Sequence, residues 1–339
     1  MSDTILTRVA PRLALILCAA LFTLGSPTSA EAEPEYVLKF QSVAPNGTPW
    51  ARQAQRLKKF WEKGSEGRLK VKLFLGRGNE IALVRKCKAG ELQAIGVSTS
   101  AMLEEIPAMG VFELPYLFTS NKESDRIIDN HLFKPTEALL RKNGFQLYIF
   151  SENGYRHFAT KGKEIHAPAD LATLKMRSQE NWIHEEMYKA LGGNPVRISV
   201  AEVLTSLSTN QVNGFDNTAL YSFATSWINE IDTWTVSDHI YQPAVVVYNR
   251  TWFDKLPKDI QELLLANREE ETKKGRRAIR RLTPKLLKKL EEKDIKVYKM
   301  TAAEKATFRQ KTAKVRNMFK TKGGKDGAKM LDIINKQSK

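Results

Sequence analysis

The N-terminal part of the mature chain alternates between short runs of β-branched and aromatic residues and longer amphipathic runs. Short alternating runs of this kind predict half-buried strands, and apolar positions three or four residues apart predict helices. Thr48 followed by Pro49 is a typical helix start, and Gly64 and Gly90 follow the last periodic residues of two helices. The expected elements are a strand at 36–41, a helix from Pro49 to 63, a strand at 69–75, a helix at 80–89 and a strand at 93–99. This βαβαβ order is typical of an α/β fold with a mainly parallel sheet covered by helices.

A second run of the same kind covers residues 170–217, in the order strand, helix, strand, helix, strand. Arg177 stands where the first of these strands ends, and Asn217 ends the last one. Arg156 stands in a strand after the turn at 153–154. Ligands of open α/β sheets collect at the carboxyl ends of strands, near helix N-termini, so Arg177 is a candidate anion anchor. We expect all three side chains to face one crevice, although a lone arginine is usually a solvated surface charge.

Several helix ends carry recognisable signals. Ser178 is the expected cap of a helix with the apolar stripe Ile183, Met187 and Leu191, and Ser199 to Glu202 has the form of a capping box. The remaining expected elements are a helix at 124–142, strands at 145–151 and 240–249, a helix at 257–293 with a break at Pro284, and an amphipathic helix at 302–339.

Two further segments leave alternatives open. The basic cluster at 273–281 is predicted to be a solvated helix face, with docking to an acidic partner or anionic lipid as the alternative. The aromatic segment at 111–118 is predicted to be core, with a cleft wall as the alternative.

Composition limits the class of protein. The 339 residues are 42% apolar and 27% charged, which is ordinary for a folded soluble protein of two domains. The net charge of +16 makes nucleic acid, anionic membrane or an acidic small ligand the candidate partners. Charge alone does not choose among these partners.

The N-terminus predicts export to the periplasm. Arg8 and Arg12 precede an apolar run at 13–24, and small residues before Ala30 form a signal-peptidase site, so cleavage is expected near Ala30. Removing residues 1–30 also removes Cys18. The single remaining cysteine, Cys87, lies on the apolar face of a helix and is predicted to be buried.

The sequence gives little support for an enzyme or for a nucleic-acid-binding protein. The run from His184 to Tyr188 begins like a zinc-protease helix, but Tyr188 occupies the place of the second histidine. The loop at 76–80 lacks the third glycine of a dinucleotide site, so its glycines are expected to shape a tight turn. No constellation meets the requirements of an active site, and no module that reads nucleic acid is present. We therefore predict no catalytic residues, no cofactor, no metal and no nucleic-acid partner.

Seven segments of the chain resemble one family, the substrate-binding proteins of TRAP (tripartite ATP-independent periplasmic) transporters, also known as the dicarboxylate-binding family. The resemblance covers nearly the whole mature chain and is most specific in the central block. The matching segments are NGYRHF at 153–158, LKMR at 174–177, MYKALGGNP at 187–195, AEVLTSL at 201–207, VNGFDN at 212–217, SDH at 237–239 and TWFDKLP at 251–257.

This resemblance implies a two-domain periplasmic-binding-protein fold of type II, with a ligand cleft between the domains. Domain I is expected at 36–153 and 242–256, domain II at 154–241, and a long helix with further C-terminal helices at 257–339 across both. By this resemblance Arg177 holds the carboxylate of an organic acid, because a planar guanidinium offers two parallel donors. Arg156 and Asn217 match two further ligand-contacting positions of the family.

Departures from the family pattern leave the ligand open. Phe215 stands where the family usually has Gln, Val200 stands where an aromatic residue is common, and Trp182 is an unusual neighbour of the arginine. We count Trp182 and Phe215 as candidate ligand residues. The expected protein is a receptor, monomeric or alternatively dimeric, that delivers an anionic organic solute to TRAP membrane subunits. The alternatives are a larger hydrophobic or amphiphilic ligand in the same fold, or a basic envelope protein that binds anionic polymer or lipid.

Overall fold

The computed structural model describes residues 34–338, so the predicted signal peptide, its cleavage point and Cys18 lie outside the described residues. No helix within this range combines the length and the hydrophobicity that crossing a bilayer requires.

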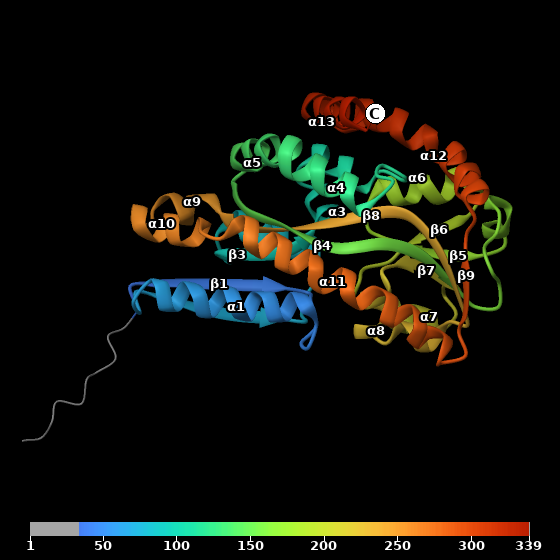
Figure 1. Ribbon diagram of the computed structural model, residues 1–339, viewed down its shortest axis with the longest axis horizontal. Helices are drawn as coiled ribbons and strands as arrows, with labels where there is room; N and C mark the ends of the chain where they lie inside the picture. The colour runs from blue at the N-terminus through green and yellow to red at the C-terminus, as the bar shows by residue number, and fades with distance from the viewer. Residues whose placement is uncertain (1–33, 339) are drawn as a thin grey trace, which may run out of the picture. The chain divides into compact units, whose positions relative to one another are not determined.

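Nine strands of the described chain form one mixed sheet (Figure 1). The strands are β1 (Tyr36–Ser42), β2 (Leu69–Leu75), β3 (Ala94–Ser98), β4 (Phe145–Thr160), β5 (Lys175–Ser178), β6 (Asn194–Arg197), β7 (Gly214–Asn217), β8 (Thr233–Asn249) and β9 (Lys296–Lys299). Their order is β2-β1-β3-β8-β4-β7-β5-β6, with β9 alongside β8. The expected mainly parallel arrangement is found in β2-β1-β3 and in β7-β5-β6. In the middle of the sheet, β4 and β8 run antiparallel to each other, β8 runs antiparallel to β3, and β4 runs antiparallel to β7, while β9 pairs with β8 in parallel.

The two central strands are long enough to run through both halves of the sheet. β4 has 16 residues and β8 has 17, and they pair from Phe145 opposite Asn249 to Thr160 opposite Thr233. The strand expected at 145–151 therefore continues for nine more residues than its pattern predicted. The proposed domain limits cross both strands where Gly154 lies opposite Gln242, beside a bulge in the pairing.

Helices cover the sheet and contribute four apolar clusters to its packing. The α-helices are α1 (Pro49–Gly64), α2 (Glu80–Ala89), α3 (Thr99–Met102), α4 (Asn121–Ile127), α5 (Phe133–Lys142), α6 (Trp182–Ala190), α7 (Val203–Ser208), α8 (Ala219–Ala224), α9 (Arg250–Asp254), α10 (Lys258–Leu265), α11 (Arg268–Glu291), α12 (Ala302–Lys322) and α13 (Gly324–Gln337). Short 3-10 segments lie at Pro107–Glu113, Pro168–Leu171 and Trp227–Glu230, and a π-helical segment, Ile128–Leu132, joins α4 to α5.

Two predicted helix starts are wrong. α6 is capped by Asn181, whose side chain accepts a hydrogen bond from the His184 amide, while Ser178 still belongs to strand β5. The Ser199 hydroxyl bonds the Glu202 carboxylate, and the helix begins later, at Val203. In both places a turn separates the strand from its helix, and a polar residue at the strand end was mistaken for the cap.

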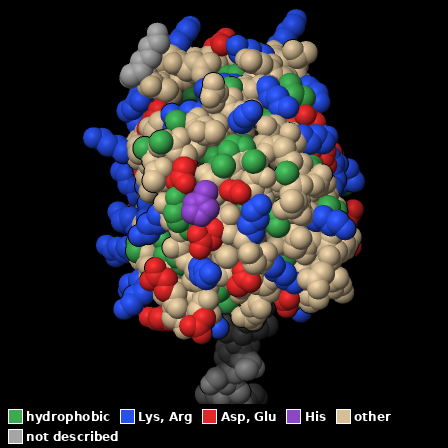
Figure 2. Space-filling view, turned by 90° about the vertical axis from the view of Figure 1, so that its right-hand side faces the viewer, with side chains coloured by type: hydrophobic (Ala, Val, Ile, Leu, Met, Phe, Trp, Pro, Cys, Tyr) green, Lys and Arg blue, Asp and Glu red, His purple; other side chains and the backbone are tan. Residues whose placement is uncertain are grey.

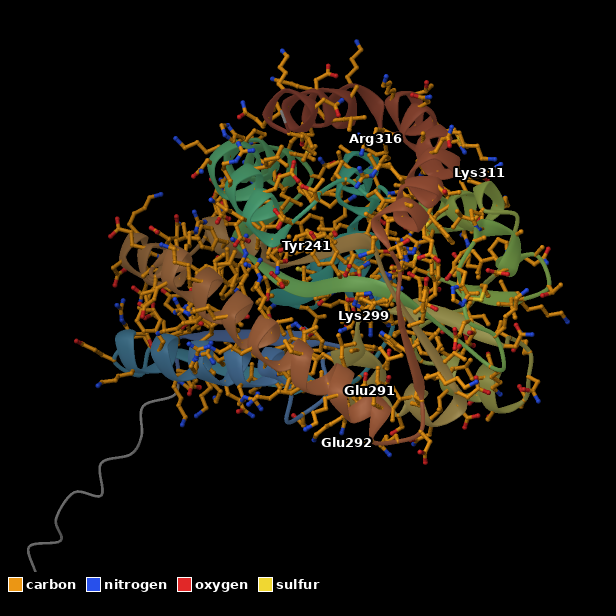
Figure 3. All side chains as sticks on the ribbon, turned by 45° about the vertical axis from the view of Figure 1, so that its right-hand side comes forward. Tyr241, Glu291, Glu292, Lys299, Lys311 and Arg316 are labelled. Atoms are coloured by element: carbon orange, nitrogen blue, oxygen red, sulfur yellow. The ribbon has the colours of Figure 1, made fainter. Side chains whose placement is uncertain are left out.

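The long C-terminal helix breaks before the proline that was expected to break it. Asn267 adopts a left-handed conformation, with φ of 57°, and separates α10 from α11. Asparagine tolerates this backbone region better than most residues do. α11 then continues through Pro284 to Glu291, which is labelled near its end in Figure 3, and it contacts both α1 and α8.

Two arginines one turn apart on α11 are held in ion pairs. Arg276 binds Asp129 with two hydrogen bonds of 2.6 and 2.8 Å, and also lies 3.1 Å from Asp125. Arg280 binds Asp125 through bonds of 2.6 and 2.7 Å, and its Nη2 lies 2.6 Å from Glu152. Paired bonds from one guanidinium fix direction as well as charge. These contacts attach α11 to α4, to the π-helical segment and to the centre of β4.

Glu152 receives a further hydrogen bond of 2.9 Å from the Tyr241 hydroxyl of β8. Tyr241 is labelled in Figure 3 near the crossing of the central strands and α11. The expected solvated face of the basic cluster at 273–281 is thus wrong for Arg276 and Arg280. It is right for Lys273, which is exposed and pairs with Glu269 of its own helix, and the half-buried Lys274 pairs with Glu270 in the same way.

Replacing Arg280 should test how much this network stabilises the fold. In Arg280→Met, the Glu152 carboxylate, which is 1% exposed, loses its cation while staying buried. We expect the free energy of unfolding to fall by about 3–5 kcal/mol, measured by urea denaturation.

Lys273→Met is the matched control, since it removes an exposed cation from the same helix, and we expect a change within about 0.5 kcal/mol. Equal losses in both variants would contradict a special role for the buried pair.

Candidate ligand-binding site

A cleft with about 840 Å³ of empty space, part of it open to solvent, lies between the two groups of parallel strands. Side chains from β1, β3, β4, β5, β7, β8, α1 and α8 line it. The polar lining includes Glu80, Arg156, Arg177, Gln179, Asn217 and Gln242.

Arg177, near the carboxyl end of β5, has a buried guanidinium whose donors are not all used. Its Nε donates to the Ile198 carbonyl at 3.0 Å, and its guanidinium carbon lies 5.7 Å from the centre of the Trp227 ring. Within residues 34–338, no acceptor takes a hydrogen bond from Nη1. Burial, together with the nearby charge of Arg156, lowers the pKa of Arg177 to about 10. A buried cation with a free donor favours binding of an anion.

Arg156 lines the same cleft, but its nitrogens already have partners. Nε donates to Asp216 Oδ2 at 2.5 Å, and Nη2 donates to the Asp216 carbonyl oxygen. Nη1 donates to Gln242 at 2.9 Å and reaches Asn217 Oδ1 at 3.4 Å. Arg156 therefore positions its neighbours and offers less to a ligand than Arg177 does.

Asp216 is the acceptor at the centre of this cluster and is fully buried. Besides Arg156, the Tyr188 hydroxyl donates to it at 2.7 Å, and His239 Nε2 lies 3.2 Å from its Oδ2. Burial alone would raise the pKa of Asp216, but the Arg156 charge and the His239 contact outweigh burial and hold this pKa well below its usual range. Asp216 is therefore a stable carboxylate under the cleft.

Glu113 is a second buried carboxylate and links the two halves of the molecule. It accepts hydrogen bonds from the Thr99 hydroxyl at 2.6 Å and from Gln242 Nε2 at 2.7 Å. His184 Nε2 of α6 lies 2.9 Å away. Gln242 also donates to Gln179 at 2.8 Å. This chain of bonds holds the floor of the cleft in one arrangement.

The structure brings together three of the five predicted ligand residues. Arg177 and Asn217 line the cleft from the ends of β5 and β7, as expected, whereas Arg156 lines it from within β4, which continues through the turn predicted at 153–154. Asn217 Oδ1 accepts a hydrogen bond from the Thr218 amide at 2.8 Å, which orients its amide group. Contact between these residues and a ligand stays a prediction.

The other two predicted residues do not line the cleft. Phe215 is fully buried in a core cluster, with its ring 5.2 Å from that of Trp227. Trp182 stacks on Phe319 of α12 at 6.5 Å, and Lys322 Nζ lies 4.6 Å from the centre of its ring.

Glu80 is a cleft residue that sequence reasoning missed. Its carboxylate accepts bonds of 2.8 Å from both the amide and the hydroxyl of Ser98, and burial raises its pKa. Gly76 and Gly78 precede it with φ of 71° and 93°, so the loop is the tight turn that its glycines predicted. An acidic residue at a helix start after such a turn was the available signal.

The structure also shows where Cys87 and the aromatic segment at 111–118 lie. Cys87 and the segment at 111–118 are buried in one core cluster, apart from Tyr116, which lies in another. Burial raises the pKa of the Cys87 thiol. Among residues 34–338, no group of three or more His, Cys, Asp and Glu side chains is arranged to hold a metal ion.

Comparison with known proteins identifies the relatives of this chain. The model of the family described as bacterial extracellular solute-binding protein, family 7, matches residues 40–322. The 2,3-diketo-L-gulonate-binding periplasmic protein YiaO of Escherichia coli is 24% identical over 83% of this chain and 86% of that protein. The sugar acid binding protein of Advenella mimigardefordensis, solved with galactonate, is 27% identical, with a TM-score of 0.84 over 89% of this chain and 98% of that one. A TRAP periplasmic solute binding protein of Sulfurospirillum deleyianum, solved with succinate, is 23% identical, with a TM-score of 0.82 over 90% and 98% of the two chains.

The buried Asp216 can be tested by removing its charge. Asp216→Asn leaves the Arg156 guanidinium buried without its counter-charge, so we expect a loss of about 3–5 kcal/mol in the free energy of unfolding.

Tyr188→Phe removes a single hydrogen bond to the same carboxylate and should cost only about 1–2 kcal/mol. Urea denaturation of both variants gives the comparison, and an Asp216→Asn loss no larger than that of Tyr188→Phe would contradict the assigned ion pair.

Proposed function

The chain belongs to family 7 of the bacterial extracellular solute-binding proteins, and we propose that it captures a carboxylate-bearing organic solute in its cleft for delivery to TRAP membrane subunits. Its architecture is the two-domain ligand-binding fold of TRAP periplasmic proteins. In this proposal the ligand carboxylate binds Arg177, and Arg156 and Asn217 flank it. The ligands of the relatives described above, 2,3-diketo-L-gulonate, galactonate and succinate, all carry a carboxylate and fit this chemistry.

The observation that carries the proposal is the free Nη1 donor of Arg177. This guanidinium is only 2% exposed, lines the cleft and has no carboxylate bonded to it within the described chain. Burying a cation without a partner costs free energy, and an arriving carboxylate supplies both charge and acceptor oxygens. The receptor is thus prepared for an anion before the anion arrives.

A role outside solute binding has less support. Members of the family act as receptors rather than as enzymes. On the face shown in Figure 2, Lys and Arg side chains are scattered among Asp and Glu and do not form a continuous basic stripe. Binding of anionic polymer or lipid is expected to need such a stripe.

Location and assembly are part of the same proposal. The family is periplasmic, and we assign the N-terminal segment before Ala30 as the export signal. We propose a monomeric receptor whose two domains close around the solute by a hinge motion. The central strands β4 and β8 pass between the proposed domains and are the natural position for that hinge.

Removing the Arg177 side chain should abolish solute binding without unfolding the protein. A panel of organic acids is screened by thermal shift, and the acid that stabilises the protein most is titrated by calorimetry. We expect Arg177→Ala to weaken its binding by about 2–5 kcal/mol.

Arg197→Ala is the matched control, because Arg197 is an exposed arginine of the adjacent strand β6 that pairs with Glu185. It should leave the affinity unchanged. Wild-type affinity in Arg177→Ala would show that the carboxylate site has been assigned to the wrong residue.

A further inference from the structure

Part of the cleft is an apolar chamber between α1 and the sheet. We define the chamber by Phe40 of β1, Ala54 and Leu57 of α1, Leu75 of β2, Gly96 of β3 and Val246 of β8, which all line the cleft. Gly96 lies opposite Val246 in the sheet, and a side chain added at Gly96 would come within 3.2 Å of the Phe40 ring. Glycine at this position therefore keeps the chamber open.

Two polar side chains beside the chamber, Gln53 and Ser98, are already bonded to the protein. Gln53 donates to the Glu271 carbonyl at 2.9 Å and accepts from the Ser151 hydroxyl at 3.2 Å. The Ser98 hydroxyl donates to Glu80. A ligand hydroxyl placed against either side chain would compete with these bonds, which is unfavourable. An apolar group would meet no such obstacle.

The cations of the cleft lining accommodate one carboxylate. Only Arg156 and Arg177 among the described lining residues carry a permanent positive charge, and Arg156 is already paired with Asp216. Glu80 is an acidic group of the same lining and would repel a second carboxylate. A dicarboxylate would therefore leave one of its charges without a counter-charge.

We infer that the solute of this receptor is a monocarboxylic acid with an apolar tail, the head on Arg177 and the tail in the chamber. The inference rests on the proposed function and narrows its substrate class. It separates this chain from relatives that were solved with a dicarboxylate or a polyhydroxy acid. Buried methylene groups would supply the affinity that hydroxyl groups supply in a sugar acid.

The test is a calorimetric series on the mature protein with butanoate, hexanoate and octanoate, together with succinate and gluconate. We expect the affinity to rise roughly fourfold with each added methylene until the chamber is full. Succinate and gluconate should bind at least about tenfold more weakly than the tightest member of the series, since neither places apolar surface in the chamber.

Two variants test whether the gain in affinity with tail length depends on the chamber. Ala54→Leu fills the chamber and should remove the gain in affinity from longer tails. Ala303→Leu makes the same chemical change at an exposed position of α12 and should preserve the gain. The wild-type series decides the question even if Ala54→Leu does not fold.

Each outcome has a defined meaning. An affinity that rises with tail length and is lost in Arg177→Ala supports the inference. Arg177-dependent binding of succinate or gluconate, with no gain from longer tails, overturns the apolar tail but leaves the proposed receptor intact. Failure of every carboxylate to bind, or binding unaffected by Arg177→Ala, overturns the proposed function and this inference with it.

Discussion

The buried ion pair between Arg156 and Asp216 is the interaction on which the site depends. It joins β4 to β7 at the floor of the cleft, and the hydroxyl of Tyr188 and the ring of His239 complete the coordination of the carboxylate. By matching the charge of one cleft arginine, the pair leaves Arg177 as the cation with a free donor. One cleft arginine is paired with a carboxylate of the protein and the other is not. The proposed selectivity for a single carboxylate follows from this difference.

Hydrogen bonds and ion pairs connect the floor of the cleft to the rest of the molecule. β4 and β8 run through both groups of parallel strands, and Gln242 on β8 connects Arg156 to the buried Glu113. On the outside, Arg280 of α11 binds Glu152 at the middle of β4. Networks of paired, fully buried charges tolerate few alternative arrangements, so these bonds hold the strands in one geometry while the proposed domains move.

Much of this organisation was predictable from local patterns. The alternation in β2, the cap at Thr48, and the strand-end positions of Arg177 and Asn217 depend on sequence neighbours only. The resemblance to the receptor family added the meaning of Arg177, which pattern alone would have left as a surface charge.

The rest depends on contacts between distant segments. The antiparallel course of β4 and β8 is decided by pairing across about a hundred residues, which no local period reveals. Arg276 and Arg280 were predicted to lie on a solvated basic face because their acidic partners are far away in the sequence. Phe215 and Trp182 were misplaced for a similar reason, since the elements that cover them, around Trp227 and Phe319, could not be seen in their own segments.

The proposed ligand has a charged head that binds Arg177 and an apolar tail that lies in the chamber. α1 packs against β2, and Ala54 of α1 and Gly96 of β3 are the small residues of the chamber lining. The central claim is that Arg177 holds a carboxylate while the chamber holds the remainder of the solute. A crystal structure of the mature protein with bound octanoate tests it most directly. The account predicts a carboxylate oxygen within hydrogen-bond distance of Arg177 Nη1 and the tail against Phe40 and Leu57. A carboxylate bound away from Arg177 would contradict it.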